Sequence, residues 1–283
     1  MDKRLNKTKS EETLGAYNKE KVIFTKDMRK EYTILMPQMA PIHFDLLESA
    51  MQSEGYKMEL LRECTPNTVE TGLKYVNNDA CYPSILTTGQ FIEALESGKY
   101  DKDRTAIIMS QTGGGCRATN YIGFIRKALK DAGYPNVPVI SFNIVGMEKM
   151  PGFKLTIPMV EKLIRCVVYA DLLQKMLTKN RAYEVNKGET QKLFDEWMEK
   201  CKKLVKGTSN KEFKQSIYDI VEDFEKIELD TEKINNIISA NNNIKDTISG
   251  IKIQIENIIQ NNTINLINVQ LKNINLILNT LDE

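Results

Sequence analysis

The chain of 283 residues is long enough for one large domain or two smaller ones with a hydrophobic core. A hydrophobic fraction of 41%, a charged fraction of 27% and a formal net charge of +1 are ordinary for a globular protein and give no indication of nucleic-acid binding. The first residues contain no apolar signal segment, and no run of about 18 consecutive apolar residues occurs, so we expect a cytoplasmic protein without membrane insertion.

Short apolar runs alternate with helical patterns after a polar, lysine-rich segment, residues 1–30, which we expect to be a flexible lead-in. Strands are predicted at 33–36, 57–61, 105–110 and 137–142. Helical spacing of apolar residues is found at 45–53, 68–75, 91–95, 117–132, 156–180, 189–205 and 211–225. We therefore expect an α/β domain over residues 31–230.

The clearest unit in this pattern begins with the strand at 105–110. A glycine-rich turn, the helix at 117–132 and the strand at 137–142 follow within about 40 residues. A strand, a helix and a second strand in this order form a βαβ crossover, which requires a parallel sheet. The sequence thus predicts a Rossmann-like layered architecture.

The composition changes abruptly in the C-terminal tail, residues 231–283, which is rich in isoleucine and asparagine. Apolar residues follow a spacing of four and three from Ile244 to Ile258 and again from Ile267 to Leu281. This pattern is typical of a coiled-coil seam that is interrupted near residues 260–263. Two short coiled helices or a hairpin would fit it, and so would a partly ordered low-complexity segment.

The segment QTGGGCR, residues 111–117, is the strongest candidate for a binding loop. Its three glycines, Gly113, Gly114 and Gly115, allow a tight turn and a close approach of the backbone to a ligand. The expected helix start behind them offers unpaired N–H groups to an anion or a thiolate. The loop is neither a dinucleotide fingerprint nor a phosphate-binding P-loop, and a tight turn without a ligand is the alternative.

The five cysteines are odd in number and irregularly spaced, which argues against a disulfide framework and favours reduced thiols or metal ligands. Three of them, Cys64, Cys81 and Cys116, lie in predicted loops that lead into helices, where ligands of an open α/β sheet gather. Cys116 is followed by Arg117, and both the guanidinium and the helix dipole favour a thiolate at this position.

The remaining two cysteines and the single histidine fit structural roles better. Cys166 and Cys201 lie on apolar helical stripes, where cysteine usually acts as a small core residue. His43 stands beside apolar residues at a helix entry, and we expect a structural or capping role for it. Three loop thiols remain as candidate ligands of an iron–sulfur site with one iron open.

Three motifs resemble the 2-hydroxyacyl-CoA dehydratase superfamily. They are VNNDACYP at 76–83, QTGGGCRATNY at 111–121 and VPVIS at 137–141. The segments PQMAPIHF at 37–44 and 154–173 are similar to one branch in particular, the dehydratase-like C-terminal region of large activase-like proteins that fuse it to ATPase modules. The resemblance covers roughly residues 20–230.

The resemblance implies a Rossmann-like domain with a cysteine-ligated [4Fe–4S] cluster, for which Cys81 and Cys116 are the expected ligands and Cys64 the expected third. It implies an ATP-dependent activator or reductase that delivers one low-potential electron, a companion dehydratase-like subunit or domain, and an acyl-CoA as the molecule acted upon. Gly113, Gly114, Gly115 and Arg117 are the expected cofactor-binding residues. No residue is assigned a catalytic role.

The chain departs from this pattern in two places. It carries no ATPase module of its own, and after Ile227 the resemblance gives way to the isoleucine- and asparagine-rich tail. We therefore expect either an iron–sulfur redox subunit or fragment of a lyase of the dehydratase type, or a non-catalytic dehydratase-like module for assembly. In both cases the tail is expected to mediate association between chains.

Overall fold

The computed structural model describes residues 21–111, 116–143, 148 and 150–281. It divides into two compact units. The first comprises Met1–Thr178 together with Thr190–Lys226, and the second comprises Lys179–Glu189 together with Ile227–Glu283. None of the helices in the described ranges combines the length and the apolar composition that crossing a membrane requires.

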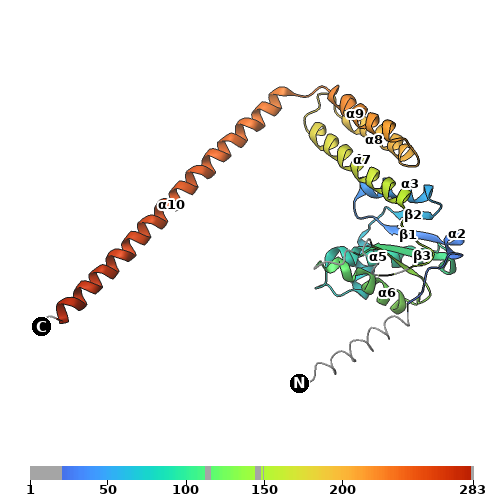
Figure 1. Cartoon of the computed structure of the whole chain (residues 1–283), viewed down its shortest axis with the longest axis horizontal. Helices are drawn as coiled ribbons and strands as arrows, with labels where there is room; N and C mark the ends of the chain where they lie inside the picture. Colours follow the sequence, from blue (N-terminus) through green and yellow to red (C-terminus); the bar gives the residue numbers. More distant parts are fainter. Residues whose placement is uncertain (1–20, 112–115, 144–147, 149, 282–283) are drawn as a thin grey trace, which may run out of the picture. The chain divides into compact units, whose positions relative to one another are not determined.

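A parallel sheet of four strands forms the centre of the first unit (Figure 1). Its strands are β1 (Thr33–Pro37), β2 (Lys57–Leu61), β3 (Thr105–Ser110) and β4 (Val139–Phe142), in the order β2-β1-β3-β4. The βαβ crossover predicted between β3 and β4 is present, and its strands pair in parallel from Ile107 with Val139 to Ser110 with Phe142. The expected fold class, a Rossmann-like layered α/β architecture, is confirmed.

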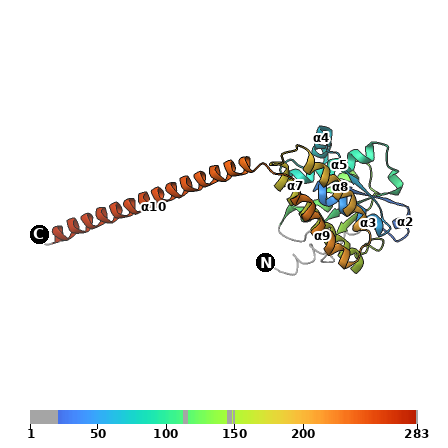
Figure 2. The same ribbon diagram turned by 90° about the horizontal axis from the view of Figure 1, so that it is seen from above.

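Helices lie on both faces of the sheet. The helices before the C-terminal one are α2 (Met28–Glu31), α3 (Pro41–Ser53), α4 (Pro66–Tyr75), α5 (Tyr82–Glu96), α6 (Tyr121–Asp131), α7 (Ile157–Arg181), α8 (Glu189–Leu204) and α9 (Asn210–Glu225), with short 3-10 turns η1 (Lys102–Arg104) and η2 (Arg117–Asn120). Figure 1 shows α3 on one side of the sheet, with α5 and α6 on the other, and Figure 2 shows α7, α8 and α9 side by side.

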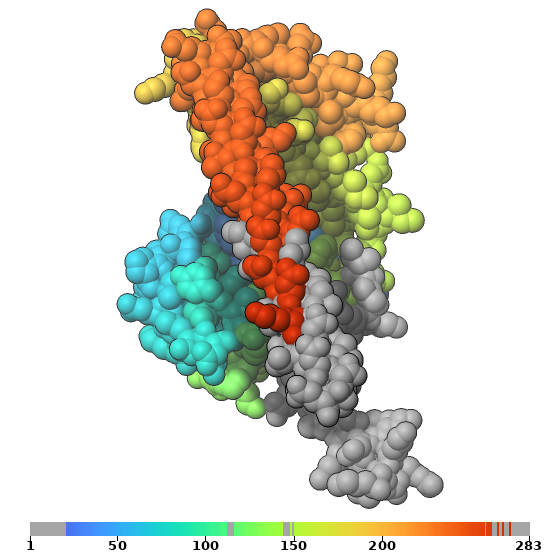
Figure 3. Space-filling model, turned by 90° about the vertical axis from the view of Figure 1, so that its left-hand side faces the viewer, coloured from blue at the N-terminus to red at the C-terminus, as the bar shows by residue number. Residues whose placement is uncertain are grey.

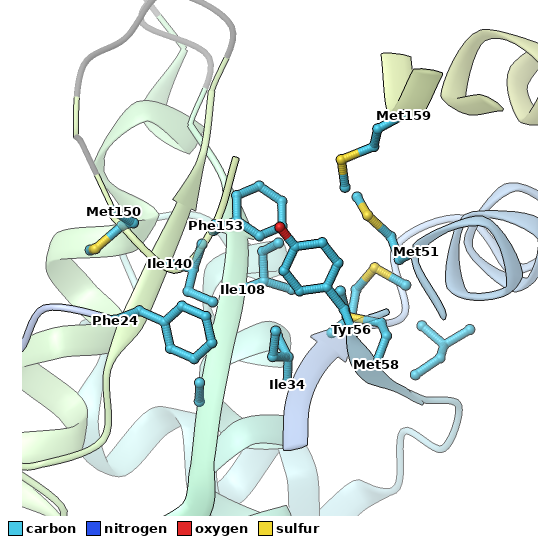
Figure 4. Packing of buried hydrophobic residues seen from close by; sticks show 13 residues of the cluster. Phe24, Ile34, Met51, Tyr56, Met58, Ile108, Ile140, Met150, Phe153 and Met159 are labelled. Atoms are coloured by element: carbon cyan, nitrogen blue, oxygen red, sulfur yellow. The ribbon is translucent and has the colours of Figure 1, made fainter. Parts of the chain in front are cut away.

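Side chains that alternate along each strand create two separate cores. Ile34 and Ile108 pack on one face, where Met51, Met58 and other buried residues of the cluster meet them (Figure 4). The neighbouring strand residues Leu35, Ile107 and Met109 point to the opposite face, where they pack in a second cluster with residues of α5 and α6. The helix residues of this cluster include Phe91, Leu95, Ile122 and Ile125. A strand buried on both faces reads as a continuous apolar run, which is how these strands appear in the sequence.

The three helices α7, α8 and α9 are tied to each other by buried polar contacts. The Tyr169 hydroxyl lies 2.6 Å from the Ser216 hydroxyl and links α7 to α9. The Trp197 indole N–H donates to the Asp223 carboxylate at 3.1 Å and links α8 to α9. The N-terminal half of α7 also joins the sheet core, because Met159 is buried in the same cluster as Ile34.

The part of the expected lead-in that the structure describes belongs to the core. Phe24 is fully buried among the residues of Figure 4, and its carbonyl accepts a hydrogen bond from the Gly152 N–H at 2.9 Å. A Cβ at Gly152 would lie 2.1 Å from the Thr25 carbonyl oxygen, so the two segments touch backbone to backbone. A flexible lead-in extending to residue 30 is thus wrong for residues 21–30, and residues 1–20 lie outside the described part.

The second unit contains the longest helix, α10 (Thr231–Leu281). An antiparallel bridge between Glu184 and Leu229 precedes it, and Asp230 caps its start by accepting a hydrogen bond from the Lys233 N–H at 2.9 Å. α10 runs without interruption for 51 residues, through the Gln260 region where the sequence pattern predicted a break. The expected pair of short helices or hairpin is therefore replaced by one continuous helix.

Candidate functional site

The carboxyl ends of β1 and β3 form the position where ligands bind in open α/β sheets. β1 connects to β2 on one side and pairs with β3 on the other, so the direction of winding reverses between β1 and β3. Two loops leave the sheet here, one after Pro37 and one after Ser110. The second is the glycine-rich loop, and Gly113, Gly114 and Gly115 lie outside the described residues.

Gln111 anchors the glycine-rich loop on both sides. Its backbone N–H donates to the Phe142 carbonyl at 2.9 Å, so β3 and β4 stay paired one residue beyond the last strand residue. Its side-chain amide donates to the Thr119 carbonyl at 3.2 Å and accepts from the Ser141 hydroxyl at 2.7 Å. One side chain therefore connects the start of the loop, the neighbouring strand and the turn that follows.

Cys116 and Arg117 stand at the end of this loop, on a 3-10 turn. The predicted helix from residue 117 begins instead with η2, and regular α-helix starts at Tyr121. The Arg117 guanidinium donates to the carbonyl of Asp79 at 2.7 Å and also to the carbonyl of Ala80. The arginine fastens the Cys116 turn to the segment immediately before Cys81, and its expected cofactor-binding role stays a prediction.

Cys81 lies at the N-terminus of α5, with its sulfur 3.0 Å from the hydroxyl of the buried Tyr121. Burial raises the pKa of Tyr121, and the hydrogen bond to Cys81 adds to the effect. The sequence-predicted ligands Cys81 and Cys116 are brought to the same part of the molecule, around Tyr121 and Arg117.

Cys64 is held at the far end of α5 from Cys81. Its neighbour Glu63 accepts a hydrogen bond from the Gln90 side chain at 2.9 Å, and its other neighbour Thr65 donates to Glu93 at 3.3 Å. Gln90 and Glu93 follow Cys81 by two and a half to three helical turns, which corresponds to about 14–18 Å along α5. The structure therefore does not bring Cys64 to the other two candidate ligands.

The separation is fixed because α4 and α5 pack with their backbones in contact. A Cβ at Gly72 would lie 2.1 Å from the Ile85 carbonyl oxygen, and one at Gly89 would lie 1.9 Å from the Thr68 carbonyl oxygen. Glycine alone permits this approach. The two helices form a rigid pair whose opposite ends carry Cys64 and Cys81.

Two thiols are therefore the largest part of a metal site that the described residues provide. Within those residues, no group of three or more histidine, cysteine, aspartate or glutamate side chains is arranged to hold a metal ion. A cubane cluster in proteins is usually held by four cysteine thiolates. Cys81 and Cys116 would supply two of these ligands, and the others would have to come from elsewhere.

Cys166 and Cys201 are core residues, as their helical stripes predicted. Both are fully buried, and the Cys166 thiol donates to the Leu46 carbonyl at 3.4 Å. Burial raises the pKa of Cys166 and that of Cys201 to about 12, so both stay protonated thiols at neutral pH. The His43 imidazole lies 2.9 Å from the Asp171 carboxylate and joins α3 to α7, in agreement with a structural role.

A small apolar pocket of about 110 Å³ opens at the carboxyl ends of β1 and β3. Met36 and Pro37 of β1, Ser110 of β3, and Phe44 and Leu47 of α3 contribute to its wall. For comparison, a dry apolar cavity of about 150 Å³ accepts a benzene ring. The pocket suits an aliphatic group of a few carbons at the position where the fold places ligands.

Comparison of the chain with protein-family models, with curated proteins and with solved structures finds no match. The site is therefore defined by its own geometry. Sequence reasoning selected Cys81 and Cys116, but it missed Tyr121 as the hydrogen-bond partner of Cys81 and Gln111 as the anchor of the loop. Both belong to the QTGGGCRATNY motif, so their positions beside the cysteine were the available signal.

Proposed function

We propose that this chain is an iron–sulfur redox subunit of a 2-hydroxyacyl-CoA dehydratase or activase-type system, in which Cys81 and Cys116 supply two thiolate ligands. It receives low-potential electrons from an ATP-dependent reductase and works beside a companion dehydratase-like subunit. A bound cluster supplies one-electron transfer. Its remaining ligands come from the companion or from a molecule bound between the two.

The observation that carries this proposal is that Tyr121 and Arg117 bring the segments of both thiols together. The Cys81 sulfur lies 3.0 Å from the Tyr121 hydroxyl, and Arg117, the residue after Cys116, donates to the carbonyls of Asp79 and Ala80 just before Cys81. A hydrogen bond to a ligating sulfur is one of the ways in which a protein sets the potential of a cluster. Tyr121 is therefore a positioning residue that orients the Cys81 thiolate.

The charges around the pair are consistent with a site for thiolates. Arg117 holds the two loops together through the carbonyls of Asp79 and Ala80, which places its positive charge next to Cys116 and beside the segment that leads into Cys81. The apolar pocket at the ends of β1 and β3 supports an aliphatic acyl group as the part of an acyl-CoA that this domain would hold.

Anaerobic reconstitution with ferrous iron and sulfide tests the proposal. The wild-type chain should become brown and bind iron, because the thiolates of Cys81 and Cys116 hold a cluster whose remaining positions are taken by a small thiol added to the reconstitution buffer. Cys81→Ser and Cys116→Ser should each lose most of the bound iron. Tyr121→Phe should keep the iron but shift the reduction potential, since it removes a hydrogen bond and no ligand.

Cys64→Ser is the matched control, because Cys64 is an exposed loop thiol like Cys116. It should retain the iron content of the wild type. If Cys64→Ser lost iron as well, the three-cysteine ligand set expected from the sequence would hold, and the placement of Cys64 and Cys81 at opposite ends of the α4–α5 pair would be contradicted. A wild-type chain that stays colourless would overturn the iron–sulfur assignment itself.

A second function, assembly without catalysis, is favoured by a separate observation. α10 presents isoleucines on its surface between Ile237 and Ile259, with Ile244 56% and Ile248 61% exposed. Under this alternative the α/β unit is a dehydratase-like module that binds no cluster, and the helix provides association. The colourless outcome of the reconstitution would support it.

A further inference from the structure

We infer that α10 is one strand of a parallel, three-stranded coiled coil, and that the other two strands are α10 helices of further copies of this chain. The inference is independent of the iron–sulfur proposal, because it rests only on the second unit. It assigns the exposed face of α10 to a partner that the chain itself supplies.

The face in question is a continuous seam of isoleucines. Ile237, Ile244, Ile248, Ile251 and Ile255 alternate at spacings of three and four, apart from one missing step at Asn241. Each is between 38% and 61% exposed, and every described side chain from Asn235 to Asn257 is exposed (Figure 3, orange to red). Residues at this spacing stay on one face of a supercoiled helix.

A helix of this composition requires a partner to be stable. Isoleucine and asparagine both have lower helix propensity than alanine or leucine, and Gly250 lies in the helix interior. Most of the stability of helices in proteins comes from packing an apolar face and not from propensity. The continuous helix Thr231–Leu281 is therefore the form that this segment takes when its seam is covered.

The seam is long enough for a stable interface. Seven isoleucines occupy its core positions between residues 234 and 258. Burial of each removes on the order of 60–100 Å² from water, which gives roughly 420–700 Å² per copy before any flanking side chain is counted. Specific interfaces begin at about 1,200 Å² in total, which is roughly 600 Å² per partner.

Two polar positions favour copies that run parallel and in register. In the heptad defined by the seam, Asn241 takes an a position, where a buried asparagine meets its own counterpart in a parallel bundle. In an antiparallel pair centred on the seam it would face Ile251 instead. Lys245 and Lys252 take e positions, and antiparallel packing would set these like charges against each other.

The number of strands follows from the side chains in the seam. Isoleucine occupies both the a positions, as in Ile248 and Ile255, and the d positions, as in Ile244 and Ile251. Isoleucine at a with leucine at d favours two strands, whereas isoleucine at both positions favours higher states, beginning with three. The seam from Ile234 to Ile258 therefore specifies a trimer.

The mass of the full-length chain in solution tests the inference. Light scattering coupled to size exclusion should give three times the 32.4 kDa chain mass. The double variant Ile248→Asp/Ile255→Asp should be monomeric at the same concentration. Ile253→Asp is the matched control, because Ile253 is 57% exposed but lies outside the seam, and it should remain trimeric.

Cross-linking in the otherwise unchanged helix tests the orientation. Asn241→Cys should form a disulfide between copies through residue 241 itself, identified by mass spectrometry of the linked peptides, whereas Asn243→Cys on the outer face should not. A monomeric wild type, or equal association of the seam and control variants, would overturn the inference. A dimer or tetramer would overturn the three-stranded assignment, and absence of the 241–241 link would overturn the parallel register.

Discussion

Isoleucine has opposite surroundings in the two units of this chain. Ile34, Ile107 and Ile140 in the sheet are fully buried, whereas Ile248 and Ile259 in α10 are 61% and 60% exposed. The sheet residues meet neighbours from strands and helices distant in the sequence, and those contacts are made within one chain. The isoleucines of α10 repeat along a single helix, and one helix cannot bury its own apolar face. The spacing of these isoleucines therefore specifies a helix, but their burial requires a second surface.

The contrast between the two units predicts the largest loss of stability when a large side chain is removed from the sheet core. Phe24→Ala should lower the free energy of unfolding by about 3–5 kcal/mol, because it leaves a cavity where a fully buried ring packs. Urea unfolding monitored by circular dichroism measures the change. Ile23→Ala is the adjacent control, since Ile23 is 50% exposed, and it should stay within about 0.5 kcal/mol of the wild type. If both variants lost the same free energy of unfolding, residues 21–30 would not belong to the core.

The contact between α4 and α5 should give the second largest loss of stability. Gly89→Ala should destabilise the chain by roughly 1–3 kcal/mol in the same urea experiment, because its Cβ would lie 1.9 Å from the Thr68 carbonyl oxygen and the helices would have to move apart. Gly207→Ala, whose Cβ would meet no atom within 4 Å, is the control. A neutral Gly89→Ala variant would show that α4 and α5 do not form a rigid pair.

The buried thiols give a smaller effect that depends on pH. Cys166→Ala should cost about 1 kcal/mol at pH 7 through the cavity it leaves. Burial raises the folded-state pKa of Cys166 from 9.0 to about 12, so between these values the unfolded chain loses the thiol proton while the folded chain retains it. The stability that wild type gains from the protonated thiol is present below pH 9 and is lost as the pH rises toward 12.

Urea unfolding at pH 7 and at about pH 10.5 measures this difference. The advantage of the wild type over Cys166→Ala should shrink at the higher pH, because only the wild type carries the buried thiol. Cys64→Ala, which removes an exposed thiol, should show no such change. A constant difference between wild type and Cys166→Ala would contradict the raised pKa.

Removal of α10 should have the smallest effect on the first unit. A chain that ends after Asp230 keeps the Glu184–Leu229 bridge and every helix from α2 to α9. Its thermal transition should stay within about 2 °C of that of the full chain, while its mass in solution changes. Failure of the truncated chain to fold would place α10 in the core and remove the contrast between the two units.

The sequence predicted most of the fold because local patterns decide it. Strands β2 and β3 and helices α8 and α9 begin and end within one residue of their expected limits, since period and flanking turns are local signals. The grouping of Cys64 with Cys81 failed for a different reason. Both residues lead into helices, but α4 and α5 pack side by side in opposite directions, and that orientation depends on glycine contacts which no local pattern reveals.

The pairing of β1 has a consequence for how the chain folds. Thr33 pairs with Lys57 on one side and with Thr105 on the other, so the second partner is synthesised much later than the first. The cavity for Phe24 closes later still, when the chain reaches Gly152 and Phe153. Long-range parallel pairing of this kind slows folding. During synthesis, one edge of β1 therefore stays without its partner strand until β3 has left the ribosome.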